Sequence, residues 1–276
     1  MKSEIALVYM VAGLSSRFGG KIKQFAKVGP NNETLIEHSI NQALKSGFSK
    51  IIFIVGEKTE QPFRELFQNN YKNTPVHYAL QNFDSEKRDR PWGTTDALCS
   101  AKHLLDCPFV VCNGDDLYGE NTFQILADHL KNPENNHGAT IGFQLIKVLP
   151  ENGTVHRGIF RTKEDNHVKS ITETFNIDKK NLEATNTTPE DLCSMNIYGL
   201  HPETLEHLNN ILTKFKEDNS EDRKAECLLP NDISTLIQNN QLTLKLHPTP
   251  DQWFGITNPE DEEIVKQILR KNTTFE

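Results

Sequence analysis

The sequence has few of the features of a disulfide-stabilised, membrane-spanning or nucleic-acid-binding protein. Its five cysteines show neither a CxxC pair nor the Cys/His spacing of a zinc site, so we expect free thiols. No apolar stretch approaches the roughly 20 residues of a membrane helix. The formal net charge is −8 and no long basic block occurs, which disfavours binding to nucleic acid or to an anionic membrane surface. We therefore expect a cytoplasmic protein without nucleic-acid or membrane partners.

A signal peptide, internal repeats and low-complexity linkers are not expected either. The apolar run near the start follows Glu4 and leads into a basic, glycine-rich segment that does not resemble a cleavage site. A chain of 276 residues with 36% hydrophobic residues is long enough to bury a sizeable core. We expect residues 1–276 to form one domain.

The order of predicted elements favours an α/β fold. Buried strands are predicted at 5–11, 50–55, 76–80 and 109–112, with helices between them at 35–45, 58–70 and 93–105. This alternation is typical of a doubly wound, mostly parallel, Rossmann-like sheet. Beyond about residue 138 strands dominate, which predicts a smaller mixed β half. Its expected strands are 139–148, 158–162, 168–172, 195–200 and 242–246, and its expected helices are 202–215, 231–239 and 259–270.

Residues 11–25, VAGLSSRFGGKIKQF, carry small and basic side chains directly after the first predicted strand. The carboxyl end of such a strand is where α/β sheets bind ligands. Ala12 and Gly13 would let a base or a phosphate approach the backbone, and Arg17 and Lys23 would add positive charge. The loop contains neither GxGxxG nor GxxxxGK[ST], so a surface turn with incidental charge remains an alternative. Its composition favours a polyphosphate ligand.

Two further polar segments are expected at the same edge of the sheet. Asp115 and Asp116, in NGDDLYG, follow the fourth strand and would suit Mg²⁺, although an Asp-rich turn is the alternative. PWGTTDAL, which contains Gly93 and Thr94, precedes a helix, where simple N-capping is the alternative. Because the carboxyl ends of parallel strands meet at one edge, the three segments together predict a magnesium–nucleotide site.

These segments resemble the nucleotidyltransferases that activate sugar 1-phosphates, which have a GT-A-like fold. The family's A-G-x-x-[ST]-R loop matches residues 12–17, and its essential lysine matches Lys23. The loop is closest to a branch with R-[FY]-G-G-x-K-Q. The resemblance implies Arg17, Lys23 and Asp115 as catalytic residues and Asp115 and Asp116 as ligands of Mg²⁺. It implies nucleotide binding by Ala12, Gly13, Ser15, Gln81, Gly93 and Thr94, and acceptor binding by Gly158, Glu173 and Asn196.

The sequence departs from the family near its end. The second metal-binding Asp or Asn of the family falls on Gly255 or on Thr257, depending on the alignment. Asn258 and Asp251 are the nearby candidates to replace it. The resemblance therefore implies only part of the usual metal site.

The reaction that the resemblance implies is transfer of a nucleoside monophosphate from a nucleoside triphosphate (NTP) to a phosphorylated small molecule, such as a sugar 1-phosphate. Arg17 would neutralise the β- and γ-phosphates, and Lys23 would bridge the acceptor phosphate and the α-phosphate. Residues up to about 137 would form the nucleotide-binding half and residues from about 138 the acceptor-binding half. A GT-A-type glycosyltransferase and a non-catalytic nucleotide-sugar-binding regulator are the alternatives. The base, the acceptor and the oligomeric state, a homo-oligomer included, stay open.

Overall fold

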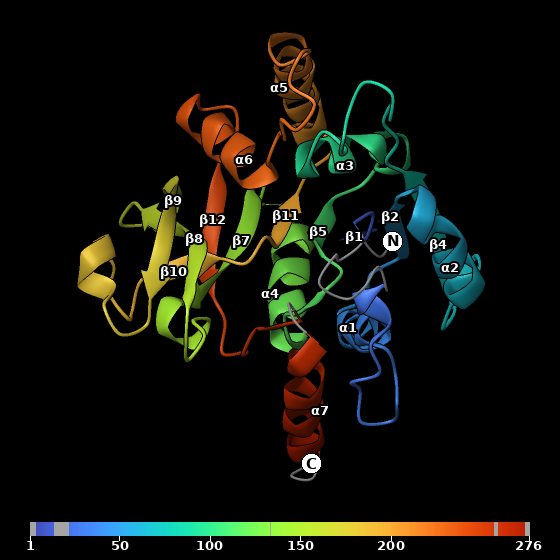
Figure 1. The fold of residues 1–276 in the computed structure, drawn as a ribbon, viewed down its shortest axis with the longest axis horizontal. Helices are drawn as coiled ribbons and strands as arrows, with labels where there is room; N and C mark the ends of the chain where they lie inside the picture. Colours follow the sequence, from blue (N-terminus) through green and yellow to red (C-terminus); the bar gives the residue numbers. More distant parts are fainter. Residues whose placement is uncertain (1–3, 14–21, 133, 257–258, 274–276) are drawn as a thin grey trace.

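A mixed β-sheet runs through both halves of the chain in this computed structural model, which describes residues 4–13, 22–132, 134–256 and 259–273. Its centre is parallel, as the sequence predicts, and antiparallel pairing of β5 with β11 (Tyr198–Leu200) links it to the second half (Figure 1). The parallel strands, in spatial order, are β4 (Thr74–Leu80), β2 (Lys50–Val55), β1 (Ala6–Met10) and β5 (Phe109–Asn113).

The second half of the sheet is mixed. Its strands follow β11 in the order β7 (Gly138–Gln144), β10 (Leu192–Ser194), β8 (Thr154–Thr162) and β9 (Val168–Asp178), all paired antiparallel. β12 (Leu244–Pro248) lies parallel to β7, and β3 (Asn70–Tyr71) borders β4. A separate pair joins β6 (Asp116–Leu117) to β13 (Phe254–Gly255).

Helices cover both faces of the sheet. Alternate residues of β1 enter two different cores, with Leu7 and Tyr9 in one and Ala6 and Val8 in the other, because successive strand residues point to opposite faces. The first core includes residues of α1 (Leu35–Leu44), α2 (Glu57–Phe67) and α4 (Glu120–Lys131). The second includes residues of α3 (Thr94–Ser100), α5 (Thr204–Asp218) and α6 (Leu229–Gln238), which lie together in Figure 1. The prediction of a doubly wound α/β fold is confirmed.

The last helix, α7 (Pro259–Thr273), packs on a small third core. Its Val265 and Leu269 meet Leu35 at the start of α1 and Leu117 in β6. No helix among the described residues combines the length and the apolar composition needed to cross a bilayer. All five cysteines are free thiols, as expected, and four of them are buried.

Some predicted elements differ from those observed. Helix α4 was not predicted, although Phe123, Leu126 and Leu130 have helical spacing and are buried. The strand expected at 195–200 begins only at Tyr198, because Asn196 has a φ of +57° that interrupts an extended chain. Strand β7 ends at Gln144 before a 3₁₀ turn, and α3 ends at Ser100 before another.

Candidate active site

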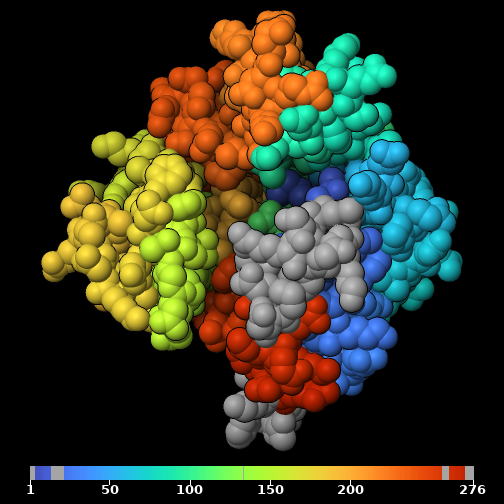
Figure 2. Space-filling model, in the orientation of Figure 1, coloured from blue at the N-terminus to red at the C-terminus, as the bar shows by residue number. Residues whose placement is uncertain are grey.

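Lys23 and Asp115 meet at the edge where β1 and β5 end. The Lys23 Nζ forms an ion pair with Asp115 and donates a hydrogen bond to the carbonyl oxygen of Ile256 at 3.3 Å. Lys23 begins a 3₁₀ turn whose Phe25 packs on Phe63 of α2, with ring centroids 4.9 Å apart. The two side chains are 19% and 24% exposed, so the pair is accessible from solvent. In Figure 2 the ends of the first strand (dark blue) and of β5 (green) lie recessed at the centre of this face.

Asp116 lies buried beside this pair. Its Oδ2 accepts hydrogen bonds from Asn113 Nδ2 at 2.9 Å and from the Tyr118 hydroxyl at 3.2 Å. Burial, and next the charge of Asp115, raise the pKa of Asp116 to about 7. A divalent cation would oppose this shift, because it favours the charged carboxylate.

Position 255, where one alignment puts the family's second acid, has no room for a side chain. Gly255 pairs with Asp116 across β13 and β6. A Cβ atom there would lie 2.9 Å from Asp116 Oδ1 and 2.4 Å from the Trp253 ring. The carboxylate of Asp251 accepts hydrogen bonds from the Thr122 amide and from Asn121 Nδ2, both at 2.8 Å. Asp251 therefore binds the start of α4, and it lines a different hollow from the one that Asp116 lines.

The two remaining candidate ligands, the carboxylates of Asp115 and Asp116, fit Mg²⁺. They are too few for a metal that is bound by protein side chains alone. Among the described residues, no group of three His, Cys, Asp or Glu side chains has the arrangement of a metal site. Two adjacent carboxylates are nevertheless a usual protein contribution to Mg²⁺, which takes its other ligands from water and substrate phosphates. Ser15, Arg17, Thr257 and Asn258 lie outside the described residues, so the structure does not place them.

Three of the five predicted nucleotide-binding residues that the structure describes, Gln81, Gly93 and Thr94, lie between β4, α3 and α6. The Gln81 Nε2 donates hydrogen bonds to the Gly93 carbonyl oxygen and to Asp96 Oδ2, each at 2.9 Å. Gly93 has a φ of +97°, and a Cβ atom there would lie 2.4 Å from the Cys227 carbonyl oxygen, so only glycine fits. The Thr94 hydroxyl accepts a hydrogen bond from the Leu229 amide at 2.9 Å. These bonds fix the loop before α3.

The other two predicted nucleotide-binding residues lie at the end of β1. Ala12 is half-buried and Gly13 is exposed. A Cβ atom on Gly13 would meet no other described atom within 4 Å, so its backbone is accessible to a ligand.

The three predicted acceptor-binding residues line one cavity of about 710 Å³. Gly158 in β8 lies opposite Glu173 in β9 and opposite Ser194 in β10. The backbone N–H of Asn196 donates a hydrogen bond to the Ser194 hydroxyl at 3.2 Å. Thr94 from the nucleotide side and the buried Asp116 line the same cavity. One predicted nucleotide-binding residue and one predicted metal ligand therefore share a cavity with the three predicted acceptor-binding residues.

Several side chains of this cavity were not predicted from the sequence as site residues. Arg157 and His156 directly precede Gly158 in β8, and Trp253 comes from the segment before β13. The adjacency of Arg157 to Gly158 is the signal that could have identified it.

Comparisons with known proteins agree with the predicted family and fold. A family model described as "Nucleotidyl transferase" matches residues 20–239. The bifunctional protein GlmU of Staphylococcus carnosus is 24% identical over 266 residues, which are 96% of this chain and 52% of that protein. The chain therefore spans about half the length of this curated relative.

Solved structures share the fold at low sequence identity. A protein from Bacillus anthracis, described as a glucose-1-phosphate thymidylyltransferase in complex with a sucrose, superposes with a TM-score of 0.71 at 12% identity, covering 96% of this chain and 95% of that one. The inositol-1-phosphate CTP transferase from T. maritima gives a TM-score of 0.67 at 10% identity, covering 98% and 96%. Because the family model matches most of the sequence, this chain belongs to the nucleotidyl transferase family.

Proposed function

We propose that the protein transfers a nucleoside monophosphate from an NTP to a phosphorylated small molecule, with sugar 1-phosphates as the leading class, and releases pyrophosphate. The observation that carries this proposal is the Lys23–Asp115 pair beside a cavity lined from both halves of the chain. The similar proteins named above support it, since their names refer to sugar or inositol 1-phosphates. We infer that residues 1–276 act as one domain, with the sheet joining the two halves through β5 and β11.

The proposed reaction is an in-line displacement. An oxygen of the acceptor phosphate forms a bond to the α-phosphorus, the bond from that phosphorus to the β-phosphate oxygen breaks, and pyrophosphate leaves. The attacking oxygen is already ionised near neutral pH, so the site needs charge neutralisation and alignment and no dedicated base. Lys23 would hold the acceptor and α-phosphates together, and Gly158, Glu173 and Asn196 would orient the acceptor. Asp115 and Asp116 would hold Mg²⁺, which neutralises phosphate charge when bound.

A second candidate function is nucleotide-sugar binding without catalysis. Gly255 favours it, because one position of the family's second acid carries no side chain and has no room for one. The retained Lys23 and Asp115 argue against it, since binding alone does not need a cation at the reacting phosphates. Arg17 would add to this argument, although its role rests on the sequence alone. The free thiols agree with the reducing cytoplasm that we propose as its compartment.

A screen for pyrophosphate release distinguishes the two functions. Four NTPs are tested with Mg²⁺ against a panel of sugar 1-phosphates, inositol 1-phosphate and phospho-alcohols. We expect release with at least one pair and none when the acceptor is omitted. Calorimetric binding of an NTP without release for any pair would support the regulator instead. Release that occurs without an acceptor would indicate hydrolysis and contradict the proposed transfer.

A further inference from the structure

Arg157 is a cation in the wall of the acceptor cavity without a carboxylate partner among the described residues. Its guanidinium donates hydrogen bonds to two backbone oxygens, that of His156 at 2.9 Å and that of Val148 at 3.2 Å. Its Nε is buried and has no hydrogen-bond partner in the described part of the chain. Burial lowers the pKa of Arg157 from its ordinary value, which shows that the charge is incompletely solvated. A buried cation of this kind is stabilised by an anion.

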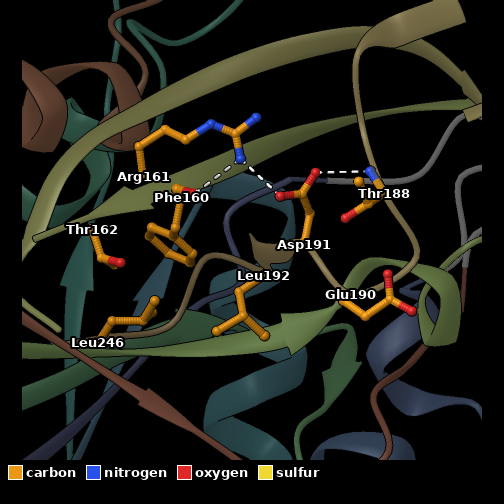
Figure 3. A pocket seen from close by; sticks show the side chains of 8 residues that line it. All are labelled: Phe160, Arg161, Thr162, Thr188, Glu190, Asp191, Leu192 and Leu246. Carbon is orange, nitrogen blue, oxygen red and sulfur yellow. Dashed lines mark hydrogen bonds and ion pairs between the residues drawn. The ribbon is translucent and has the colours of Figure 1, made fainter. Parts of the chain in front are cut away.

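A neighbouring arginine on the same strand, Arg161, is paired with a carboxylate of the protein. Arg161 forms an ion pair with Asp191 at 2.8 Å, and Figure 3 shows both side chains beside a separate hollow. Asp191 also accepts a hydrogen bond from the Thr188 amide at 2.9 Å. Strand β8 therefore carries one arginine with its own carboxylate and one without.

The local backbone explains why Arg157 faces the cavity. The register between β8 and β9 shifts between Val155 and Arg157, as in a β-bulge. A bulge changes the direction of the side chains that follow it, and four consecutive residues, 155–158, line the cavity. The Arg157 guanidinium carbon lies 5.6 Å from the centre of the Trp253 ring. The ring limits the directions open to the guanidinium.

The acids near Arg157 leave its charge available to a ligand. Asp116 and Glu173 favour the charged guanidinium electrostatically, but neither forms an ion pair with it. Asp116 is bonded instead to Asn113 and Tyr118. His156 is adjacent, and its Nδ1 accepts a hydrogen bond from the Asn176 amide at 3.0 Å, which leaves Nε2 as the protonated nitrogen of the neutral ring. The Arg157 end of the cavity is therefore rich in hydrogen-bond donors.

We propose that Arg157 binds the acceptor phosphate that attacks the NTP, from the acceptor side of the cavity. The inference rests on the proposed function. A guanidinium can form two parallel hydrogen bonds to one phosphate, which fixes the direction of its remaining oxygen as well as neutralising charge. Lys23 then lies between the α-phosphate and the acceptor phosphate, and Arg157 adds a second contact to the acceptor phosphate from the other side. The acceptor class is accordingly a phosphomonoester whose phosphate reaches the 155–158 segment.

The test uses Trp253 as a reporter. The chain has two tryptophans, so Trp92→Phe leaves Trp253, next to Arg157, as the single indole. Its fluorescence is titrated with inorganic phosphate and with α-D-glucose 1-phosphate in the presence of Mg²⁺. We expect a saturable change in W92F and a dissociation constant raised about tenfold or more in W92F/R157Q. Arg161→Gln is the matched control on the same strand and should leave the constant unchanged. Arg157→Lys, which keeps the charge and loses the paired geometry, should be intermediate.

The outcomes separate this inference from the proposed function. Absence of a saturable response in W92F, supported by calorimetry on the unmodified protein, overturns the inference. Binding by R157Q within twofold of its parent does the same, even if pyrophosphate is released. Loss of phosphate binding in folded R157Q without pyrophosphate release from the unmodified protein supports the anion site and contradicts the transferase. If R157Q does not fold, R157K provides the test. Phosphate binding by R157K equal to that of its parent would contradict the two parallel hydrogen bonds from the guanidinium to the phosphate. In an active enzyme, R157Q should raise KM for the acceptor and leave KM for the NTP within about twofold.

Discussion

The Lys23 side chain connects two distant segments of the chain at the candidate site, the end of β5 and the end of β13. It contacts both the Asp115 carboxylate and the backbone of Ile256, next to β13. Asp115 would share its charge with Mg²⁺ when the metal is bound, and Lys23 could then turn to a phosphate. A lysine that can exchange a carboxylate for a phosphate suits a reaction in which negative charge accumulates between two phosphates.

Replacing Lys23 by alanine should lower kcat by about 10²–10³-fold, the usual effect of losing a charged group that stabilises a transition state. Pyrophosphate release under saturating substrates measures this effect. Lys27→Ala is the matched control, since Lys27 is exposed in the same segment. Turnover by K23A equal to that of the unmodified enzyme would remove Lys23 from the mechanism.

Residue patterns in the sequence pointed to some of the residues that line the cavity and not to others, for a physical reason. Gly158, Glu173 and Asn196 stand out because their motif positions need a small residue, an acid and an amide, and they do line one cavity. Arg157 and Trp253 do not stand out. Arg157 points into the cavity because of a bulge, and bulges depend on strand register that the sequence pattern does not reveal.

At the scale of elements, the start of α4 bears on whether Asp251 is a helix-capping residue or a metal ligand. The helix begins after Gly119, and its N-cap has no side-chain hydrogen bond of its own. Asp251, distant in sequence, accepts the Thr122 amide instead. Unpaired amides at a helix start favour a negative charge, so this contact accounts for the position of Asp251 without a metal.

Asp251→Ala should therefore destabilise the protein by about 1 kcal/mol, the usual cost of losing a cap, and lower Tm by about 2–4 °C. The Mg²⁺ concentration needed for half-maximal activity should not change. Asp251→Asn, which keeps an oxygen acceptor, should lose less stability. A raised Mg²⁺ requirement in D251N together with an unchanged Tm would instead make Asp251 a metal ligand.

The elements themselves were largely predictable, and the exceptions have local causes. Strands β1, β2 and β5 are buried on both faces, so each appears as a continuous apolar run in the sequence, whereas β4 alternates between buried and exposed residues. Helix α4 was missed although its buried residues have helical spacing. The Asp-rich segment before it was assigned to a loop, and no element was predicted directly after that loop. Strand β11 is shorter than expected because of the left-handed backbone at Asn196, which a sequence pattern does not show.

For the molecule as a whole, a group of histidines links elements from both halves. His129 at the end of α4 and His247 in β12 are joined by a ring-to-ring hydrogen bond of 3.1 Å. His129 Nε2 bonds the His137 carbonyl oxygen at 3.1 Å, so Nε2 is its donor and Nδ1 accepts from His247. His137 also packs on His167, whose Nδ1 lies 2.7 Å from Asp165. The His129 ring is therefore neutral in this arrangement.

This arrangement predicts how the stability of the whole fold depends on pH. Burial, followed by the nearby His129, Lys245 and His137, lowers the pKa of His247 from 6.5 to about 4. Between these values the unfolded chain binds a proton that the folded protein does not, so the free energy of unfolding falls as the pH decreases through this range. The largest slope for one such group is about 1.4 kcal/mol per pH unit. The contribution of His247 is measured as a difference between variants, because Asp116, whose pKa is raised to about 7, adds stability as the pH decreases over nearly the same range.

Urea unfolding is followed from pH 8 to pH 4. Between about pH 6.5 and pH 4, His247→Gln, whose amide can still donate to His129, should gain stability relative to the unmodified protein as the pH decreases. Substitution of the exposed His77 by Gln should leave the curve parallel to that of the unmodified protein. Parallel curves for H247Q and the unmodified protein would mean that protonation of His247 does not weaken the fold.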